Sequence, residues 1–238
     1  MRPLTDTCPK PLLQVRGKPL MQWHLEALAR GGARSVMVNT AWLGTQISGH
    51  FGHRFGGPIA TDGQGPQTSI ATLDLVYSNE GLDFGEALET AGGITRALPN
   101  LADPFWVVAG DIFAPDFAFP QSAARNFRES GNLAHIWLVP NPSHNPNGDF
   151  ALSSAGLARN DGDLRHTYST IGLYRHALFT PPYCDIVAGN PQGAKAALAP
   201  VLRSAIARDR VSAHLYTGPW VDVGTPQRLA QLNQASAP

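Results

Sequence analysis

Apolar positions follow two alternating periods over roughly the first two-thirds of the chain. Between residues 19 and 30 they recur at helical spacing, and two glycines follow, which end a helix. The run FWVVA at residues 105–109 is continuously apolar instead, which is typical of a buried strand. The same criteria predict helices over residues 19–30, 42–51, 91–98, 123–129, 194–207 and 226–233, strands over 35–39, 73–77, 105–109, 134–139 and 211–216, and a loop rich in Gly, Pro and Gln over 52–67.

Strands and helices that alternate at these intervals predict crossover connections and a mostly parallel sheet flanked by helices. Between residues 148 and 174 the apolar runs are shorter and separated by turns, which favours an antiparallel flap or an added subdomain. No repeat and no long linker interrupts the pattern. We therefore expect an α/β fold in which residues 1–238 form a single domain.

Composition excludes several classes of protein. Only 15% of the 238 residues are charged and the net charge is zero, which argues against nucleic-acid binding and against a basic membrane-binding patch. No apolar run approaches the roughly 20 residues that span a bilayer, and the first residues do not resemble a signal peptide. Cys8 and Cys184 match no metal or redox spacing. We expect a cytoplasmic enzyme, a monomer or a small homo-oligomer.

Lys10 stands between Pro9 and Pro11, and the two prolines leave it little backbone freedom. A lysine restrained in this way can direct its charge at a phosphate group. The alternative is a surface loop that merely avoids helix.

Two further stretches are each open to two interpretations. The small residues after Glu89 open a helix, so they could expose backbone N–H groups to a ligand or serve close packing. Asp111 follows a buried strand, where open α/β sheets bind ligands, although an aspartate there could equally be an N-cap.

Asp222 lies in an apolar run that leads into a predicted helix. Thr225 and Pro226 have the residue types of an N-cap and a first helical residue. Capping does not account for Asp222, because a carboxylate in apolar surroundings needs a partner or a metal.

In this order the motifs resemble those of the sugar-1-phosphate nucleotidyltransferases, from PLT..CPKPL near the start to WVDVGTPQRL near the end. The segments VNTAWLG, ALETAGGI, GDF and YSTIGLYR are most similar to the N-acetylmuramate α-1-phosphate uridylyltransferases, which act in cell-wall sugar recycling. The resemblance implies a Rossmann-like fold with a nucleotide-binding half at residues 1–140 and a sugar-binding half at 141–238. It also implies UTP and a sugar 1-phosphate as substrates.

The resemblance implies roles for individual residues. Lys10 matches the lysine that contacts the phosphates, and Asp111 and Asp222 match the two carboxylates that hold catalytic Mg²⁺, so we expect these aspartates to approach each other at one end of the parallel strands. The sugar phosphate is expected to attack the α-phosphorus of UTP without a general base, and no histidine is assigned to catalysis. The implied nucleotide-binding positions are Lys10, Asn39, Glu89, Thr90 and Gly92, and the implied sugar-binding positions are Asp149, Ser169 and Gly172.

The N-terminus departs from the family pattern. The family has a first strand and a Gly-rich loop, LAAGxGxR, before the segment that matches Met1. We expect the protein to begin upstream and residues 1–238 alone, which lack that strand, to be inactive or nearly so. Strands 35–39 and 105–109, which would flank the first strand, are expected to lie about 10 Å apart or to have collapsed together.

Two other functions stay open. One is a different nucleotide and sugar, as in mannose-1-phosphate guanylyltransferases, which resemble this chain in the first half. The other is a non-catalytic sugar-nucleotide-binding protein, which the absent phosphate loop favours and the retained Lys10, Asp111 and Asp222 oppose.

Overall fold

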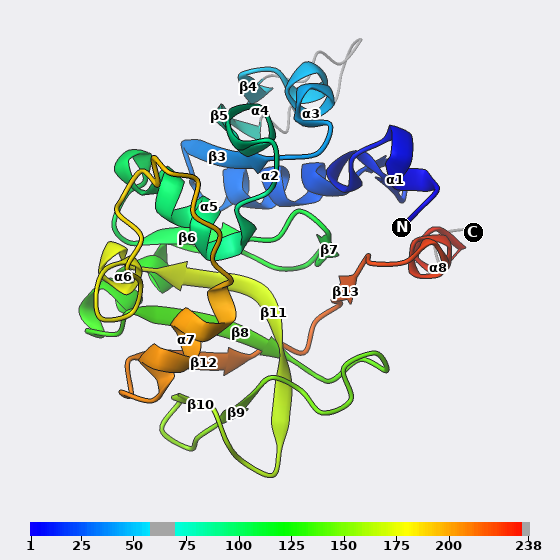
Figure 1. Cartoon of the computed structure of the whole chain (residues 1–238). Helices are drawn as coiled ribbons and strands as arrows, with labels where there is room; N and C mark the ends of the chain where they lie inside the picture. The colour runs from blue at the N-terminus through cyan, green and yellow to red at the C-terminus, as the bar shows by residue number, and fades with distance from the viewer. Residues whose placement is uncertain (58–69, 235–238) are drawn as a thin grey trace. The chain divides into compact units, whose positions relative to one another are not determined.

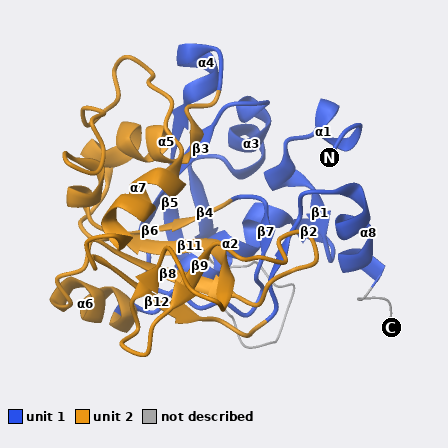
Figure 2. Ribbon diagram, turned by 60° about the horizontal axis from the view of Figure 1, so that its bottom comes forward, with its two compact units in different colours: residues 1–86, 110–121, 219–238 blue, residues 87–109, 122–218 orange. Residues whose placement is uncertain are grey.

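The chain passes back and forth between two units, which have separate colours in Figure 2. Unit 1 consists of residues 1–86, 110–121 and 219–238, and unit 2 consists of residues 87–109 and 122–218. The computed structural model describes residues 1–57 and 70–234 (Figure 1). The predicted halves, 1–140 and 141–238, were divided by binding role rather than by packing, and that division stays a prediction.

A three-stranded sheet covered by two helices forms one part of unit 1. Its strands lie in the order β3 (Ser35–Thr40), β5 (Ile70–Asn79) and β4 (Arg54–Gly57), with β3 and β5 parallel. The apolar face of α2 (Leu20–Arg30) packs with α3 (Gly44–Phe51) and β5 in one buried cluster. Its fully or nearly buried members include Leu25, Leu73 and Leu75.

The other part of unit 1 joins the two ends of the chain. The hairpin of β1 (Gln14–Val15) and β2 (Lys18–Pro19) turns through Arg16 and Gly17, which both have positive φ, as a two-residue hairpin turn requires. The side-chain amide of Asn233 in α8 (Pro226–Gln234) accepts a hydrogen bond from the Arg16 N–H and donates one to the Gln14 carbonyl. Unit 1 also contains three short helices, α1 (Leu4–Thr7), α4 (Glu80–Phe84) and the 3₁₀ helix Lys10–Leu12.

Unit 2 is built on one curved sheet. Its main path runs β10-β9-β11-β8-β12, and β6 pairs with the C-terminal half of β11 (Figure 1). One face of this sheet packs against α5 and α7 through a core that includes Ile136, Tyr174 and Leu202. The elements are α5 (Glu89–Ala97), β6 (Phe105–Val108), α6 (Gln121–Glu129), β8 (Ala134–Val139), β9 (Phe150–Leu152), β10 (Ala158–Arg159), β11 (Arg165–Tyr174), α7 (Leu198–Ile206) and β12 (Val211–Leu215), with 3₁₀ helices at Leu98–Asn100 and His176–Phe179.

The α/β class with mixed sheets and flanking helices is confirmed, and the predicted helices and strands are all present. Their ends shift by up to three residues, except that the helix predicted from residue 194 begins at Leu198. Parallel pairing is less common than predicted. Among the described strands only the pairs β3/β5 and β8/β12 are parallel, and the other seven pairs are antiparallel. Three of these seven pairs involve the long strand β11, which runs opposite to β6, β8 and β9.

Three other expectations concern particular segments. The loop predicted over 52–67 contains β4 at its start, and residues 58–67 lie outside the described part of the chain. Strands β3 and β6 belong to different sheets, so the spacing expected between them stays a prediction. Within residues 1–57 and 70–234, no helix combines the length and apolar character needed to cross a membrane.

Candidate active site

Lys10 and Asp111 form an ion pair in unit 1. Lys10 begins a 3₁₀ helix that Pro9 precedes, and its Nζ donates to Asp111 Oδ2 over 3.1 Å. Pro11 packs against Gly110, since a Cβ added there would lie 3.3 Å from the proline Cγ. The two side chains are 41% and 37% exposed, so the pair contributes little to stability, at most about 1 kcal/mol. A role of this ion pair in binding or catalysis therefore explains its position better than a role in stabilising the fold.

Asp222 is brought beside Asp111 by a two-stranded ribbon. Strand β13 (Val221–Asp222) pairs with β7 (Ile112–Phe113), which places Asp222 opposite Ile112. The N–H of Val223 donates to the Asp111 carbonyl over 2.8 Å. The backbones of the two aspartates are therefore neighbours, through an antiparallel ribbon rather than at the ends of parallel strands. The approach of their carboxylates stays a prediction.

Arg228 is the partner of Asp222, and the sequence analysis missed it. Its Nη1 donates to Asp222 Oδ2 and to the Asp222 carbonyl, each over 2.8 Å. The predicted cap is confirmed, because Thr225 Oγ1 accepts from the Arg228 N–H and α8 begins at Pro226. The sequence did contain a signal for this pair. Arg228 lies in the first turn of the predicted helix, and the capping residue Thr225 follows Asp222 by three positions.

His24 is buried beneath the β7/β13 ribbon and bonds to its backbone. It is 3% exposed, and its Nε2 lies 2.8 Å from the Ile112 carbonyl in β7. Burial disfavours the imidazolium form and lowers the pKa of His24 to about 4, although the bond to Ile112 and the charge of Asp111 act in the opposite direction. The ring is therefore neutral at pH 7, and Nε2 carries the proton that it donates to Ile112.

The buried His24 makes stability depend on pH. Its folded pKa of about 4 lies below the ordinary value of 6.5, so its contribution to stability is complete above pH 6.5 and is lost as the pH falls towards 4. The full effect is on the order of 3 kcal/mol. His24→Gln keeps a donor without the titration, and we expect its free energy of unfolding, measured in urea, to fall less steeply between pH 6.5 and 4.5.

A matched control for this prediction is His50→Gln, since His50 is exposed. The free energy of unfolding of this variant should fall with decreasing pH as steeply as that of the unsubstituted protein. Some slope should persist in His24→Gln, because burial and the nearby His214 also lower the pKa of His135 to about 4. Equal slopes in the two variants would contradict the assignment of a neutral, buried His24.

The glycine-rich start of α5 serves packing. The N–H groups of Ala91 and Gly92 both donate to the Ala196 carbonyl, and a Cβ added to Gly92 would lie 2.6 Å from the Ala194 carbonyl oxygen. These donors are therefore already bonded within unit 2. Of the two interpretations of this stretch, close packing is the one that the structure supports at Gly92.

The other three predicted nucleotide-binding side chains are exposed. Asn39 lies near the end of β3 in unit 1, and Glu89 and Thr90 begin α5 in unit 2. Glu89 has a φ of +59°, which is unusual for a residue other than glycine and costs backbone free energy. Such strain at an exposed residue is typical of functional positions, and the nucleotide contact stays a prediction.

The predicted sugar-binding residues lie at an irregularity of β11 in unit 2. Asp149 Oδ2 accepts hydrogen bonds from the Tyr168 N–H and from the Asn145 side chain, over 2.8 and 3.2 Å. These two donors fix the orientation of the Asp149 carboxylate, whose residue is only partly buried. Asp149 is thus in a position compatible with its predicted role.

Ser169 and Gly172 are both buried and make internal contacts. The Ser169 hydroxyl, in a residue with no exposed surface, donates to the Trp137 carbonyl over 2.7 Å and accepts from the Ile171 N–H. A Cβ added to Gly172 would lie 2.7 Å from the Tyr174 hydroxyl oxygen. The predicted direct contact of Ser169 with a sugar is therefore not supported, because its hydroxyl braces the bulge in β11.

The donor set suits a cation that is shared with a ligand. Within the described ranges, no group of three or more His, Cys, Asp or Glu side chains could hold a metal. Mg²⁺ is commonly bound by one or two carboxylates together with substrate phosphates and water. Asp222 in β13 and Asp111, the residue before β7, could supply the carboxylates of such a site.

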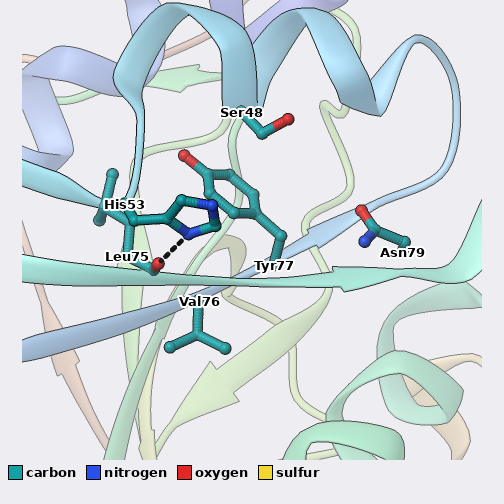
Figure 3. Close-up of a pocket in the computed structure, with 6 residues that line it drawn as sticks. All are labelled: Ser48, His53, Leu75, Val76, Tyr77 and Asn79. Atoms are coloured by element: carbon teal, nitrogen blue, oxygen red, sulfur yellow. Dashed lines mark hydrogen bonds between the residues drawn. The ribbon is translucent and has the colours of Figure 1, made fainter.

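A separate hollow of about 350 Å³ lies between α3 and β5 in unit 1, and contains none of these residues. Figure 3 shows His53 and Tyr77 on the side of β5 that faces α3, and Val76 on the other side. Tyr77 donates to the Gly52 carbonyl, and the His53 ring lies beside Tyr77. His50 and His53 are both exposed.

Comparison with known proteins identifies relatives of the chain by sequence. The sequence model of the family described as nucleotidyl transferase matches residues 1–237. The chain is 43% identical over 235 residues to an N-acetylmuramate alpha-1-phosphate uridylyltransferase from Neisseria meningitidis, covering 97% of this chain and 90% of the relative. It is 26% identical over 255 residues to the mannose-1-phosphate guanylyltransferase catalytic subunit beta of Drosophila pseudoobscura, covering 62% of that protein.

Solved structures agree on the fold. A Bacillus anthracis crystal structure with the provisional name glucose-1-phosphate thymidylyltransferase superposes with a TM-score of 0.73 at 15% identity, covering 99% of this chain and 89% of the other. The matched relatives are named as enzymes that join a nucleotide to a sugar 1-phosphate. The chain belongs to the nucleotidyl transferase family.

Proposed function

We propose that the protein transfers a uridylyl group from UTP to N-acetylmuramate α-1-phosphate, giving a UDP-sugar and pyrophosphate. The observation that carries this proposal is the ion-paired Lys10 and Asp111 beside Asp222, in a chain 43% identical to a relative named for that reaction. Because UTP is made and used in the cytoplasm, we place the reaction there, in the recycling of cell-wall sugars.

Positioning and charge neutralisation dominate the chemistry. A phosphate oxygen of the sugar 1-phosphate forms a bond to the α-phosphorus of UTP, while the bond from that phosphorus to the bridging oxygen breaks and pyrophosphate leaves. The attacking oxygen is already an anion, so no side chain needs to remove a proton. His24, whose Nε2 bonds the Ile112 carbonyl next to Asp111, is buried and has no role as a base in this step.

Lys10, Asp111 and Asp222 have distinct roles in this proposal. Asp111 and Asp222 would hold Mg²⁺, which when bound neutralises charge on the α-phosphate. The ammonium group of Lys10 has three donors, so it can contact a phosphate oxygen in addition to, or instead of, Asp111.

The substrate groups are assigned to three exposed residues and to the partly buried Asp149. Asn39, Glu89 and Thr90 would bind the uridine, and Asp149 would bind a sugar hydroxyl through the carboxylate that Tyr168 and Asn145 orient. An ionised carboxylate is a strong acceptor for a sugar hydroxyl.

Nucleotide choice tests the proposal. A site that bonds the edge of uracil leaves buried polar groups unpaired when a purine is offered, so we expect UTP to exceed GTP by at least about tenfold in kcat/KM. Pyrophosphate release with N-acetylmuramate 1-phosphate as acceptor measures both values.

Two outcomes would redirect the assignment. A preference for GTP with mannose 1-phosphate would favour guanylyl transfer, in line with the similarity to the Drosophila relative. Absence of turnover with every pair, combined with binding of a UDP-sugar, would favour a non-catalytic binding protein.

A further inference from the structure

Each of the two aspartates at the site is paired with a cation from the same unit. Lys10 Nζ lies 3.1 Å from Asp111 Oδ2, and Arg228 Nη1 lies 2.8 Å from Asp222 Oδ2. The two carboxylates and the two cations sum to zero charge. The motifs that resemble the family imply roles for Lys10, Asp111 and Asp222, and none for Arg228.

Arg228 is held in place from several directions. Its Nη1 bonds both the side chain and the carbonyl of Asp222, and its Nε lies 3.4 Å from Thr225 Oγ1. Gly224 leaves the room for this arrangement, since a Cβ there would lie 2.9 Å from Asp222 Oδ1 and 3.2 Å from Arg228 Nη2. The side chains of Arg228 and Asp222 are 24% and 32% exposed. This pair is better fixed than an ordinary surface ion pair.

A fixed guanidinium beside a carboxylate has two effects on a cation that the carboxylate binds. It orients the carboxylate, and its permanent positive charge opposes the approach of a divalent cation. A triphosphate adds several negative charges at the same place and offsets this opposition. The affinity of the site for a divalent cation should therefore be low without nucleotide and high with it.

We propose that Arg228 is a positioning residue that orients Asp222 and, together with Lys10, balances the charge of the aspartate pair. By this balance the site binds a divalent cation together with the nucleotide and only weakly alone. The proposal rests on the proposed function, because it takes Asp111 and Asp222 as the cation ligands.

Binding of Mn²⁺, followed by its electron paramagnetic resonance signal, tests the charge balance directly. Without nucleotide, Arg228→Met should bind Mn²⁺ about tenfold more tightly than the unsubstituted protein, because a nearby positive charge is gone. Arg228→Lys keeps the charge and should stay within about twofold. If Arg228 only oriented the Asp222 carboxylate, Arg228→Met would bind Mn²⁺ more weakly than the unsubstituted protein, because that orientation would be lost.

A second uncharged variant guards against misfolding. Arg228→Gln keeps a hydrogen-bond donor near Asp222, and it decides the question by the same criterion if Arg228→Met does not fold. Arg54→Gln, which removes an exposed arginine paired with Asp74, is the matched control and should leave Mn²⁺ affinity unchanged. Unchanged or weaker Mn²⁺ binding in a folded, uncharged Arg228 variant would overturn the proposal.

Failure of this inference can be told apart from failure of the proposed function. Asp222→Asn is measured with Mn²⁺ and UTP together. If it loses Mn²⁺ binding while the Arg228 variants bind free Mn²⁺ normally, the cation site stands and only the role of Arg228 falls. If Asp222→Asn keeps full binding, the aspartate pair is not the site and both proposals fall.

Discussion

Asp111→Asn is expected to lower kcat by at least about a thousandfold. The substitution removes one of two carboxylates that would hold the cation, and losses of this size follow when the charge that neutralises a reacting phosphate is removed. The fold should survive, because Asp111 is 37% exposed and its bond to Lys10 contributes at most about 1 kcal/mol. Pyrophosphate release gives kcat, and urea unfolding gives the free energy of unfolding.

Asp116→Asn provides the matched control, since Asp116 is exposed in the same chain segment, 110–121. It should have normal turnover. If Asp111→Asn kept more than about a tenth of the kcat of the unsubstituted protein, Asp111 would have no essential part in the reaction.

Lys10→Met should lower kcat/KM for UTP by about a hundredfold, because one charged donor to the phosphates is lost. Stability should change little, since Lys10 is 41% exposed. Steady-state kinetics in UTP measures the loss.

Lys18→Met is the comparison for the lysine. Lys18 pairs with Glu26 and lies over the Trp23 ring, so its loss should affect stability and leave turnover near normal. A similar loss of kcat/KM in both lysine variants would show that general loss of charge, rather than the position of Lys10, causes the effect.

The sequence predicted the elements whose periodicity is strong. Helix α2 and strands β3 and β8 fall within a residue or two of the predicted ranges, because each buries a regular apolar face or run. The pairing of the strands was harder to predict, because the spacing of apolar residues does not show whether two neighbouring strands are parallel or antiparallel. The long strand β11 pairs with β6 on one side and β8 on the other. Both pairs join residues far apart in the sequence, so no local pattern predicts them.

In the candidate site, too, contacts between residues adjacent in the sequence could be predicted, and contacts that depend on the folded chain could not. The capping role of Thr225 was predictable because it depends on adjacent residues. The partnership of Arg228 with Asp222 and the support from His24 to Ile112 depend on how the chain folds back, so sequence alone did not show them. Gly92 and Ser169 were assigned to ligands by resemblance, whereas their contacts in the structure are internal.

The central claim is that Asp111 and Asp222 act together on one cation in uridylyl transfer. The most direct measurement compares kcat for Asp111→Asn, Asp222→Asn and the double substitution, with UTP and N-acetylmuramate 1-phosphate as substrates. Residues that act as a unit give strongly non-additive losses. The account predicts that the double variant keeps a kcat within about threefold of the slower single variant. Losses that multiply, so that the double variant falls about another thousandfold, would contradict it.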